Sequence, residues 1–306
     1  GKRKIITQVL ALSLIKVAEE KGENEMVKAL WNTYYCQRKI YVSGFRAYSK
    51  PCKNRFCTVC LSNKKADIIN RYLPELKTWD APFFLTLTMK SVTAGLIKHQ
   101  IKIMKKALRS IIGKYKKRNQ RGKGIKLKGI TSMECNFNPK EKTYNVHFHL
   151  ILPNLKISDT IMTEWLLYWN NKELVTKGAQ CNKRIKKLND GLIEVIKYGT
   201  KIFTVQDVKK KLKGKGKEKI YAAAFYNIVK AMREERIFER FGFNLPKADK
   251  SKIVKNKELT DYKEFEYNPQ LFDWQNNTTG ERLSKHLPSD ELIKYLFSDR
   301  IDMILE

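Results

Sequence analysis

Apolar positions recur along this chain at two spacings, which predict helices and strands. Steps of three and four residues, with their flanking signals, predict helices over 5–35 (broken at 21–24), 63–76, 97–115, 158–171, 192–201 and 221–238. Ser158 is the expected N-cap of the helix over 158–171. Apolar or alternating runs predict strands over 83–89, 129–136, 144–152 and 180–188. The mixture indicates an α+β fold.

The strands over 129–136 and 144–152 are predicted to form an antiparallel hairpin that carries the first candidate chemistry. His147 and His149 lie two residues apart on one strand, so their side chains share a face. Glu134 lies on the partner strand and can complete a three-ligand metal site. Two imidazoles and one carboxylate favour Mg²⁺ or Mn²⁺, with positions open for water and phosphate oxygens. The alternatives are hydrogen-bonded or solvated histidines and a solvated carboxylate.

Four of the six cysteines cluster in a separate segment. Cys52, Cys57 and Cys60 follow one another closely, and Cys36 precedes Cys52 by sixteen positions. A Cys-x-x-Cys knuckle with two further cysteines nearby suits structural Zn²⁺ in tetrahedral coordination. Free buried thiols or a redox pair are the alternatives, but the thioredoxin-like context of a redox pair is missing. Cys135 and Cys181 are expected to be ordinary buried thiols.

The composition of the chain adds one prediction, which is that the protein binds a polyanion. The 306 residues carry a formal net charge of +31, and 42% of them are hydrophobic. Such an excess of positive charge, on a chain with enough apolar residues to form a core, indicates a nucleic-acid partner. The alternative is that the many lysines reflect a lysine-rich proteome. Residues 258–306 hold eleven acidic and five basic residues, a net charge of −6, which leaves +37 on the preceding 257.

Several classes of protein are not expected from the same sequence. No apolar run approaches the roughly 20 residues of a membrane span. No signal-peptide cleavage pattern and no phosphate-binding loop of the ATPase type are present. We therefore expect an intracellular, cytoplasmic protein that has no membrane partner and is not an ATP-driven motor.

The helix predicted over 192–201 carries a candidate nucleophile. Glu194, Tyr198 and Lys201 follow at steps of four and three residues, which places them on one helical face. A tyrosine has a pKa of about 10, but an adjacent ammonium favours the phenolate, and a metal-polarised phosphate accepts it more readily. Alone, such a tyrosine is more often a core or surface residue.

Taken together, these motifs resemble a known superfamily. The order Phe84-Leu-Thr-Leu-Thr88, His147-Phe-His149 and Tyr198-Gly-Thr-Lys201 is similar to the three motifs of the HUH endonucleases. The segment Cys52-Lys-Asn-Arg-Phe-Cys57-Thr-Val-Cys60 resembles the cysteine segment of single-tyrosine rolling-circle plasmid replication initiators of Gram-positive type. The resemblance covers roughly residues 36–245.

The resemblance implies a fold and a reaction. The fold would be an HUH nuclease with a central antiparallel sheet of about five strands flanked by helices, plus a small four-cysteine zinc-binding element. Tyr198 would attack single-stranded or hairpin origin DNA and form a 5′-phosphotyrosyl link, while Glu194 would activate water to end the round. Lys201 would orient the metal site or neutralise the phosphate. The alternatives are an HUH transposase or mobilisation relaxase, or a non-catalytic zinc-containing DNA-binding regulator.

The expected organisation has four parts. These are a helical lead-in (1–35), a four-cysteine zinc-binding element with a helix (36–80), an HUH nuclease domain (81–245) and an acidic C-terminal region (246–306). DNA contacts are expected from the basic segments 98–118, 116–128 and 209–219. The acidic region, with a helix expected over 290–305, could pack on the nuclease, recruit a host helicase or mediate homodimer formation.

Overall fold

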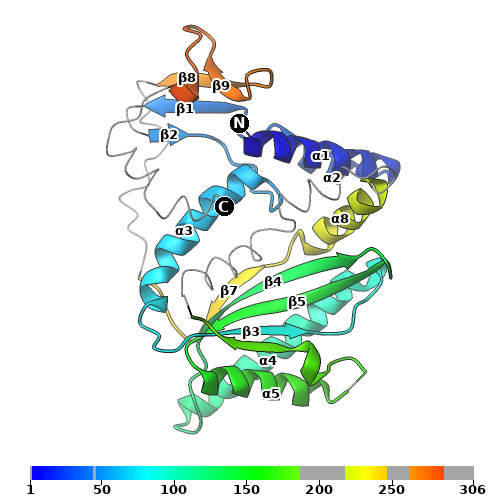
Figure 1. The fold of residues 1–306 in the computed structure, drawn as a ribbon, viewed down its shortest axis with the longest axis vertical. Helices are drawn as coiled ribbons and strands as arrows, with labels where there is room; N and C mark the ends of the chain where they lie inside the picture. The colour runs from blue at the N-terminus through cyan, green and yellow to red at the C-terminus, as the bar shows by residue number, and fades with distance from the viewer. Residues whose placement is uncertain (1, 44–45, 172, 187–217, 247–261, 286–306) are drawn as a thin grey trace. The chain divides into compact units, whose positions relative to one another are not determined.

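The computed structural model describes residues 2–43, 46–171, 173–186, 218–246 and 262–285 (Figure 1). The chain divides into two compact units. One consists of residues 67–245, and the other combines residues 1–66 with residues 246–306. Each unit has its own β-sheet.

The unit formed by residues 67–245 is built on a five-stranded antiparallel sheet in the order β6-β3-β5-β4-β7. Its strands are β3 (Phe83–Thr88), β4 (Gly129–Asn138), β5 (Thr143–Leu152), β6 (Cys181–Arg184) and β7 (Phe238–Phe241). The β4–β5 hairpin and the strand β3 lie where the sequence predicted them. The expected α+β class and five-stranded antiparallel sheet are thereby confirmed.

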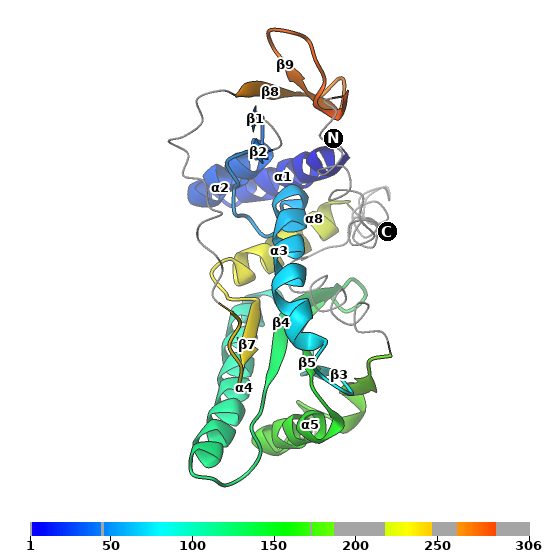
Figure 2. The ribbon, with the colours of Figure 1, turned by 90° about the vertical axis from the view of Figure 1, so that its left-hand side faces the viewer.

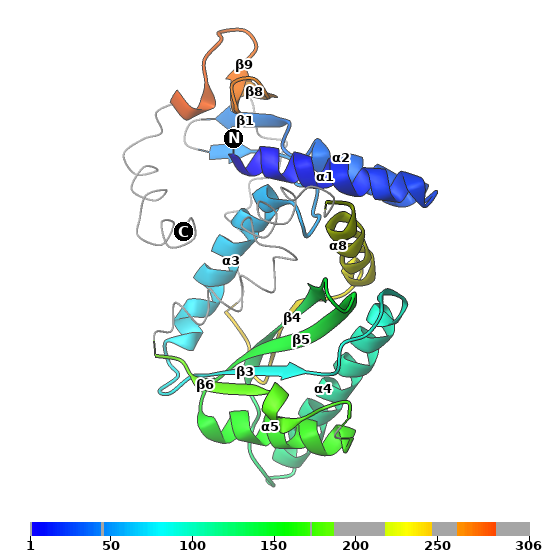
Figure 3. The ribbon, with the colours of Figure 1, turned by 45° about the vertical axis from the view of Figure 1, so that its right-hand side comes forward.

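Helices lie against this sheet on both faces. The helices α4 (Ile97–Gln120) and α5 (Leu155–Trp169) lie on one face (Figures 1 and 3). Trp165 of α5 is fully buried, and its ring contacts that of Phe148 on β5. Phe148 is flanked along β5 by His147 and His149, so strand alternation sends both histidines to the other face.

The second face is apolar at one end of the strands. There the C-terminal half of α3 (Thr58–Leu76) crosses the sheet, as Figure 2 shows. Residues of α3 and Trp79 form one buried cluster with Ile130 of β4 and Ile151 of β5; the α3 members are Ile68, Tyr72, Leu73 and Leu76. A buried side chain of this kind contributes about 1.5–3 kcal/mol, so the cluster anchors α3 on the histidine face.

Gly242 lies directly after β7, where the chain passes close to the backbone that leads into β4. Its φ is 76°, in the left-handed region, and a Cβ atom there would lie 2.0 Å from the Leu127 carbonyl oxygen. Only glycine fits such a conformation at such a close approach.

Some predicted helix ends are wrong. The helix α5 begins at Leu155, and the Asn154 side chain caps it by accepting a hydrogen bond from the Ile157 N–H at 3.0 Å. Ser158, the predicted N-cap, instead donates to the Asn182 side chain at 2.7 Å. The helix over 97–115 continues to Gln120, because its basic last turn remains a good helix former.

The long helix predicted over 221–238 is also divided. The helix α8 spans Glu218–Met232, and Phe238 begins β7. The backbone of Met133 on β4 donates to the Ile237 carbonyl oxygen at 3.0 Å, so pairing with the sheet replaces helical hydrogen bonds here. Tertiary pairing therefore overrides the apolar spacing that favoured a longer helix.

The other unit brings residues 262–285 together with the N-terminal segment. It contains two neighbouring helices and a sheet in the order β2-β1-β8-β9. These elements are α1 (Lys2–Glu20), α2 (Asn24–Tyr34), β1 (Lys39–Ser43), β2 (Arg46–Tyr48), β8 (Lys263–Asn268) and β9 (Asp273–Asn276). The break between α1 and α2 was predicted, but the strands were not. The helices expected over 192–201 and 290–305 and most of the basic segment 209–219 lie outside the described residues.

Among the described residues, none of the helices is both long and apolar enough to span a membrane.

Candidate metal centres

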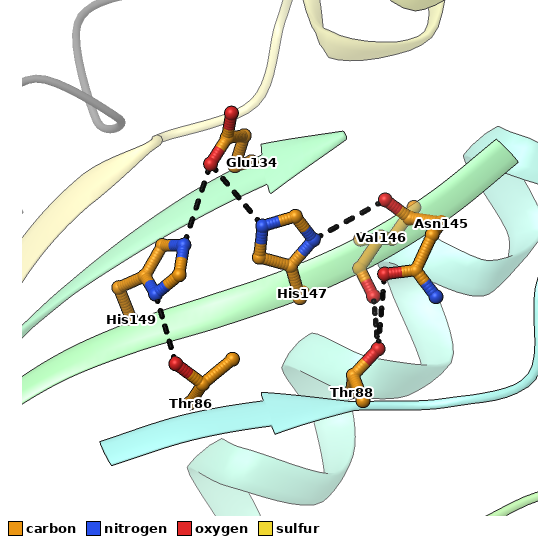
Figure 4. A network of polar contacts seen from close by, with 7 residues as sticks. All are labelled: Thr86, Thr88, Glu134, Asn145, Val146, His147 and His149. Carbon is orange, nitrogen blue, oxygen red and sulfur yellow. Dashed lines mark hydrogen bonds and ion pairs between the residues drawn. The ribbon is translucent and has the colours of Figure 1, made fainter. Parts of the chain in front are cut away.

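The register of the central strands brings three candidate ligands together. Glu134 on β4 pairs directly with His147 on β5. His149 lies opposite Ser132 on β4 and Thr86 on β3. Because directly opposed residues share a face, Glu134 and both histidines project from the same side of the sheet. Figure 4 shows the carboxylate between the two rings.

The three side chains form one buried polar cluster. The Glu134 Oε2 atom lies 3.1 Å from the His147 Nε2 atom and 3.3 Å from the His149 Nε2 atom. The exposed fractions of Glu134, His147 and His149 are 8%, 7% and 8%. The donor atoms all lie within 4.8 Å of one another. One carboxylate and two imidazoles that converge in this way fit a divalent cation of the Mg²⁺ or Mn²⁺ class.

Contacts behind the imidazoles orient them toward the carboxylate. The His149 Nδ1 atom lies 3.1 Å from the Thr86 hydroxyl, and the His147 Nδ1 atom lies 3.3 Å from the Asn145 carbonyl oxygen. Partners of this kind fix the ring and leave Nε2 for the metal side. The sequence places Thr86 on a predicted strand, in the first of the three motifs of the resemblance. It did not identify Asn145, since a backbone carbonyl has no residue-type signal.

The neighbouring histidines keep the Glu134 carboxyl ionised, which is the form that binds a cation. Burial raises the pKa of the Glu134 carboxyl, but the hydrogen bonds and charges of His147 and His149 together outweigh burial and hold that pKa below its usual value. The carboxylate is therefore ionised at neutral pH. The neighbouring thiol behaves in the opposite way, because burial raises the pKa of Cys135 to about 12.

The four clustered cysteines converge as well, in the unit that contains the chain ends. The Sγ atom of Cys60 lies 3.3 Å from that of Cys36 and 3.8 Å from that of Cys52, and all four sulfurs, including that of Cys57, lie within 4.8 Å of one another. Thiolates bound to tetrahedral zinc at about 2.3 Å lie about 3.8 Å apart. The four free cysteines therefore fit a structural zinc ion.

The cysteine sulfurs accept hydrogen bonds from the backbone around them. Backbone N–H groups donate to three of the sulfurs, from Cys52 to Cys36, from Asn54 to Cys52 and from Cys60 to Cys57. Hydrogen bonds among the thiols, led by that with Cys36, lower the pKa of Cys60, whereas hydrogen bonds led by that with Cys52 raise the pKa of Cys36. The buried ammonium of Lys4 donates to the Cys36 carbonyl oxygen and offsets part of the negative charge.

The structure does not place every predicted site residue. Glu194, Tyr198 and Lys201 lie outside the described residues, so their relation to the histidine pair stays a prediction. Cys135 is buried as expected, whereas Cys181 is partly exposed at the edge strand β6.

We expect Thr86→Val to weaken Mn²⁺ binding roughly tenfold, because the variant removes the partner that orients His149. Isothermal titration calorimetry with Mn²⁺ measures this. Thr131→Val is the matched control, since Thr131 is a buried threonine on the opposite face of the same sheet. Equal losses in both variants would show that Thr86 has no orienting role.

We expect Cys57→Ser to lose the zinc that the wild-type chain retains, because an alcohol is a poor replacement for a thiolate ligand. Elemental analysis of the purified protein measures the zinc content. Cys181→Ser should keep the wild-type amount, since Cys181 is not part of the cluster. A wild-type protein purified without any zinc would contradict the assignment.

Comparison with known proteins points to a distant relative. No protein-family profile matches the chain, and no solved structure matches it. A curated protein of Staphylococcus aureus named "Protein rep" is 29% identical over 165 residues, which is 49% of this chain and 69% of the relative. The chain is thus similar, at a distance and over about half its length, to a Rep protein.

Proposed function

We propose that this protein is a rolling-circle replication initiator that nicks and rejoins single-stranded origin DNA. The observation that carries the proposal is the buried cluster of Glu134, His147 and His149 on one face of an antiparallel sheet. The distant relative named "Protein rep" and the net charge of +31 support it independently. We also propose that the fold of this nuclease is of the HUH type.

The proposed reaction is a transesterification at a DNA phosphate. Glu134, His147 and His149 would hold a divalent cation, which when bound supplies Lewis-acid polarisation of the scissile phosphate. The Tyr198 phenolate forms a bond to phosphorus as the bond from phosphorus to the 3′-oxygen breaks, and the departing oxygen takes up a proton. The products are a 5′-phosphotyrosyl link and a free 3′-hydroxyl end.

The remaining proposed residues act on charge and on protons. Lys201 favours the phenolate of Tyr198 and neutralises the phosphate, because both carry negative charge. Glu194 takes a proton from water at the end of the round, so that hydroxide releases the DNA from Tyr198. Catalysis of this kind depends on positioning more than on covalent chemistry.

The basic helix α4 would bind DNA away from the scissile phosphate. It packs on the same face of the sheet as α5 (Figure 3), and strand alternation directs the histidine pair to the other face. Three of its lysines form ion pairs: Lys105 with Glu235 at 2.6 Å, Lys114 with Glu164 at 2.8 Å and Lys98 with Glu234 at 3.7 Å. Exposed lysines of the same helix, such as Lys102 and Lys106, are better suited to phosphate contacts.

A non-catalytic DNA-binding regulator remains the second candidate, because the cysteine cluster and the charge would suit it equally well. A covalent adduct separates the two functions. Labelled single-stranded origin DNA is incubated with the protein and Mn²⁺, and the adduct is sought after denaturation. No adduct with any candidate origin would favour the regulator.

We expect Tyr198→Phe to abolish the covalent adduct while DNA affinity stays within a few-fold, because the variant removes only the attacking oxygen. Denaturing electrophoresis measures the adduct, and fluorescence anisotropy measures binding. Tyr168→Phe, at an exposed tyrosine of α5, serves as the control that should retain the adduct. Continued cleavage by Tyr198→Phe would exclude Tyr198 as the nucleophile.

We expect Glu194→Ala to nick at a rate close to that of the wild type but to accumulate the covalent adduct, because water is no longer activated for the terminating step. A time course of adduct formation and release measures both steps. Glu194→Gln separates loss of the base from loss of side-chain volume. Release at the wild-type rate would remove the proposed role of Glu194.

A further inference from the structure

A partly exposed aromatic cluster directly precedes the first residue of the cysteine cluster. The Trp31 and Tyr35 rings are stacked, with centroids 5.9 Å apart and an interplanar angle of 24°. The Tyr34 ring meets both edge-on, at 5.4 Å from Trp31 and 5.0 Å from Tyr35. Tyr35 is 49% exposed, so much of its ring surface faces solvent.

The backbone beneath this cluster is held rigidly. The buried Lys4 ammonium donates to the Tyr34 carbonyl oxygen at 2.6 Å. The indole N–H of Trp274 donates to the Gln37 carbonyl oxygen at 2.7 Å. Gln37 has a φ of 54°, in the left-handed region, which fixes a sharp turn. The backbone next to the rings is thus held in place before any ligand arrives, which lowers the entropic cost of binding.

Cationic groups lie beside the rings. The Arg38 guanidinium carbon lies 5.8 Å from the Tyr35 ring centroid, and the Arg38 side chain is 59% exposed while it pairs with Glu266. Exposed Lys28 precedes Trp31 by three residues on α2, so both lie on one side of that helix. Aromatic faces next to exposed cations are the combination that single-stranded nucleic acids contact.

A purely structural role does not account for Tyr35. A ring that is half exposed gains only part of the stabilisation of a buried one. The turn that presents it is nevertheless fixed by contacts from α1 and β9. An exposed ring that stacks on a second ring and lies beside cations offers a surface on which a base can stack.

We propose that Trp31, Tyr35 and Arg38 form a stacking platform for the bases of single-stranded DNA, separate from the Glu134 and histidine cluster. Bases stack on the exposed ring surface, Arg38 lies against the Tyr35 ring while it pairs with Glu266, and Lys28 contacts a flanking phosphate. The choice of DNA over RNA rests on the proposed function, whereas the stacking itself does not. The platform needs no cleavage chemistry, so it can be tested with DNA that contains no origin.

The test measures binding of the full-length protein to labelled oligo(dT) by fluorescence anisotropy, at two salt concentrations and without Mn²⁺. Tyr35→Leu should bind roughly tenfold more weakly than the wild type, because it keeps apolar volume but loses the ring. Tyr35→Phe should bind as the wild type does. The dependence of affinity on salt should be unchanged, because no cation is removed.

Two further variants and one further ligand complete the experiment. Trp31→Leu is an independent variant that should show a similar loss, and Tyr168→Leu, at an exposed tyrosine of the other unit, should show none. Zinc content and circular dichroism establish that each variant is folded. Wild-type affinity in both Tyr35→Leu and Trp31→Leu would overturn the platform, and tighter binding of oligo(U) than of oligo(dT) would overturn the choice of DNA.

The nuclease proposal fails separately. A missing adduct in the wild type, together with weaker oligo(dT) binding by Tyr35→Leu, would reject the nuclease and retain the platform. An adduct in the wild type with unchanged binding by Tyr35→Leu would reject the platform and retain the nuclease.

Discussion

The register between β3, β5 and β4 is the constraint on which the candidate active centre depends. Successive side chains of a strand point to opposite faces, so a slip of one residue on β5 would send His147 and His149 to the other side. Pairing of Glu134 with His147 and of Thr86 with His149 prevents that slip from both neighbours. Apolar residues on the opposite face, such as Phe148 against Trp165, add a large hydrophobic cost to any change of register.

The same constraint makes a buried polar cluster tolerable. Three ionisable side chains that are each about nine-tenths buried would be costly if unpaired, and removing one partner of a buried charged pair costs about 3–5 kcal/mol. Here each histidine meets Glu134 on one side and a hydrogen-bond partner on the other, Thr86 or the Asn145 backbone. Such a cluster can exchange hydrogen bonds among its members for bonds to a cation.

The two units divide the chemistry between them. One contains the candidate carboxylate and histidine ligands, and the other contains the cysteine cluster, the partly buried ring of Trp31 and the exposed ring of Tyr35. A four-sulfur site leaves no open coordination position, so its role is to fix the turn structure around it. A centre with a carboxylate and two imidazoles leaves positions for phosphate oxygens. This division suits the proposed initiator, which would both hold and cut a nucleic acid.

The sequence by itself determined the β4–β5 hairpin, the shared face of His147 and His149, and the position of Glu134 beside them. This was possible because the alternation of side chains along a strand is a local property that can be read from the residue types. It also determined the cysteine cluster through spacing. Only the tertiary structure decided that α8 ends early so that β7 can pair with β4, that β8 and β9 join the N-terminal strand β1, and that Asn145 supports a histidine through its backbone. These features depend on hydrogen bonds between segments that are distant in the sequence or very short, and such contacts leave no periodic pattern of apolar residues in the chain.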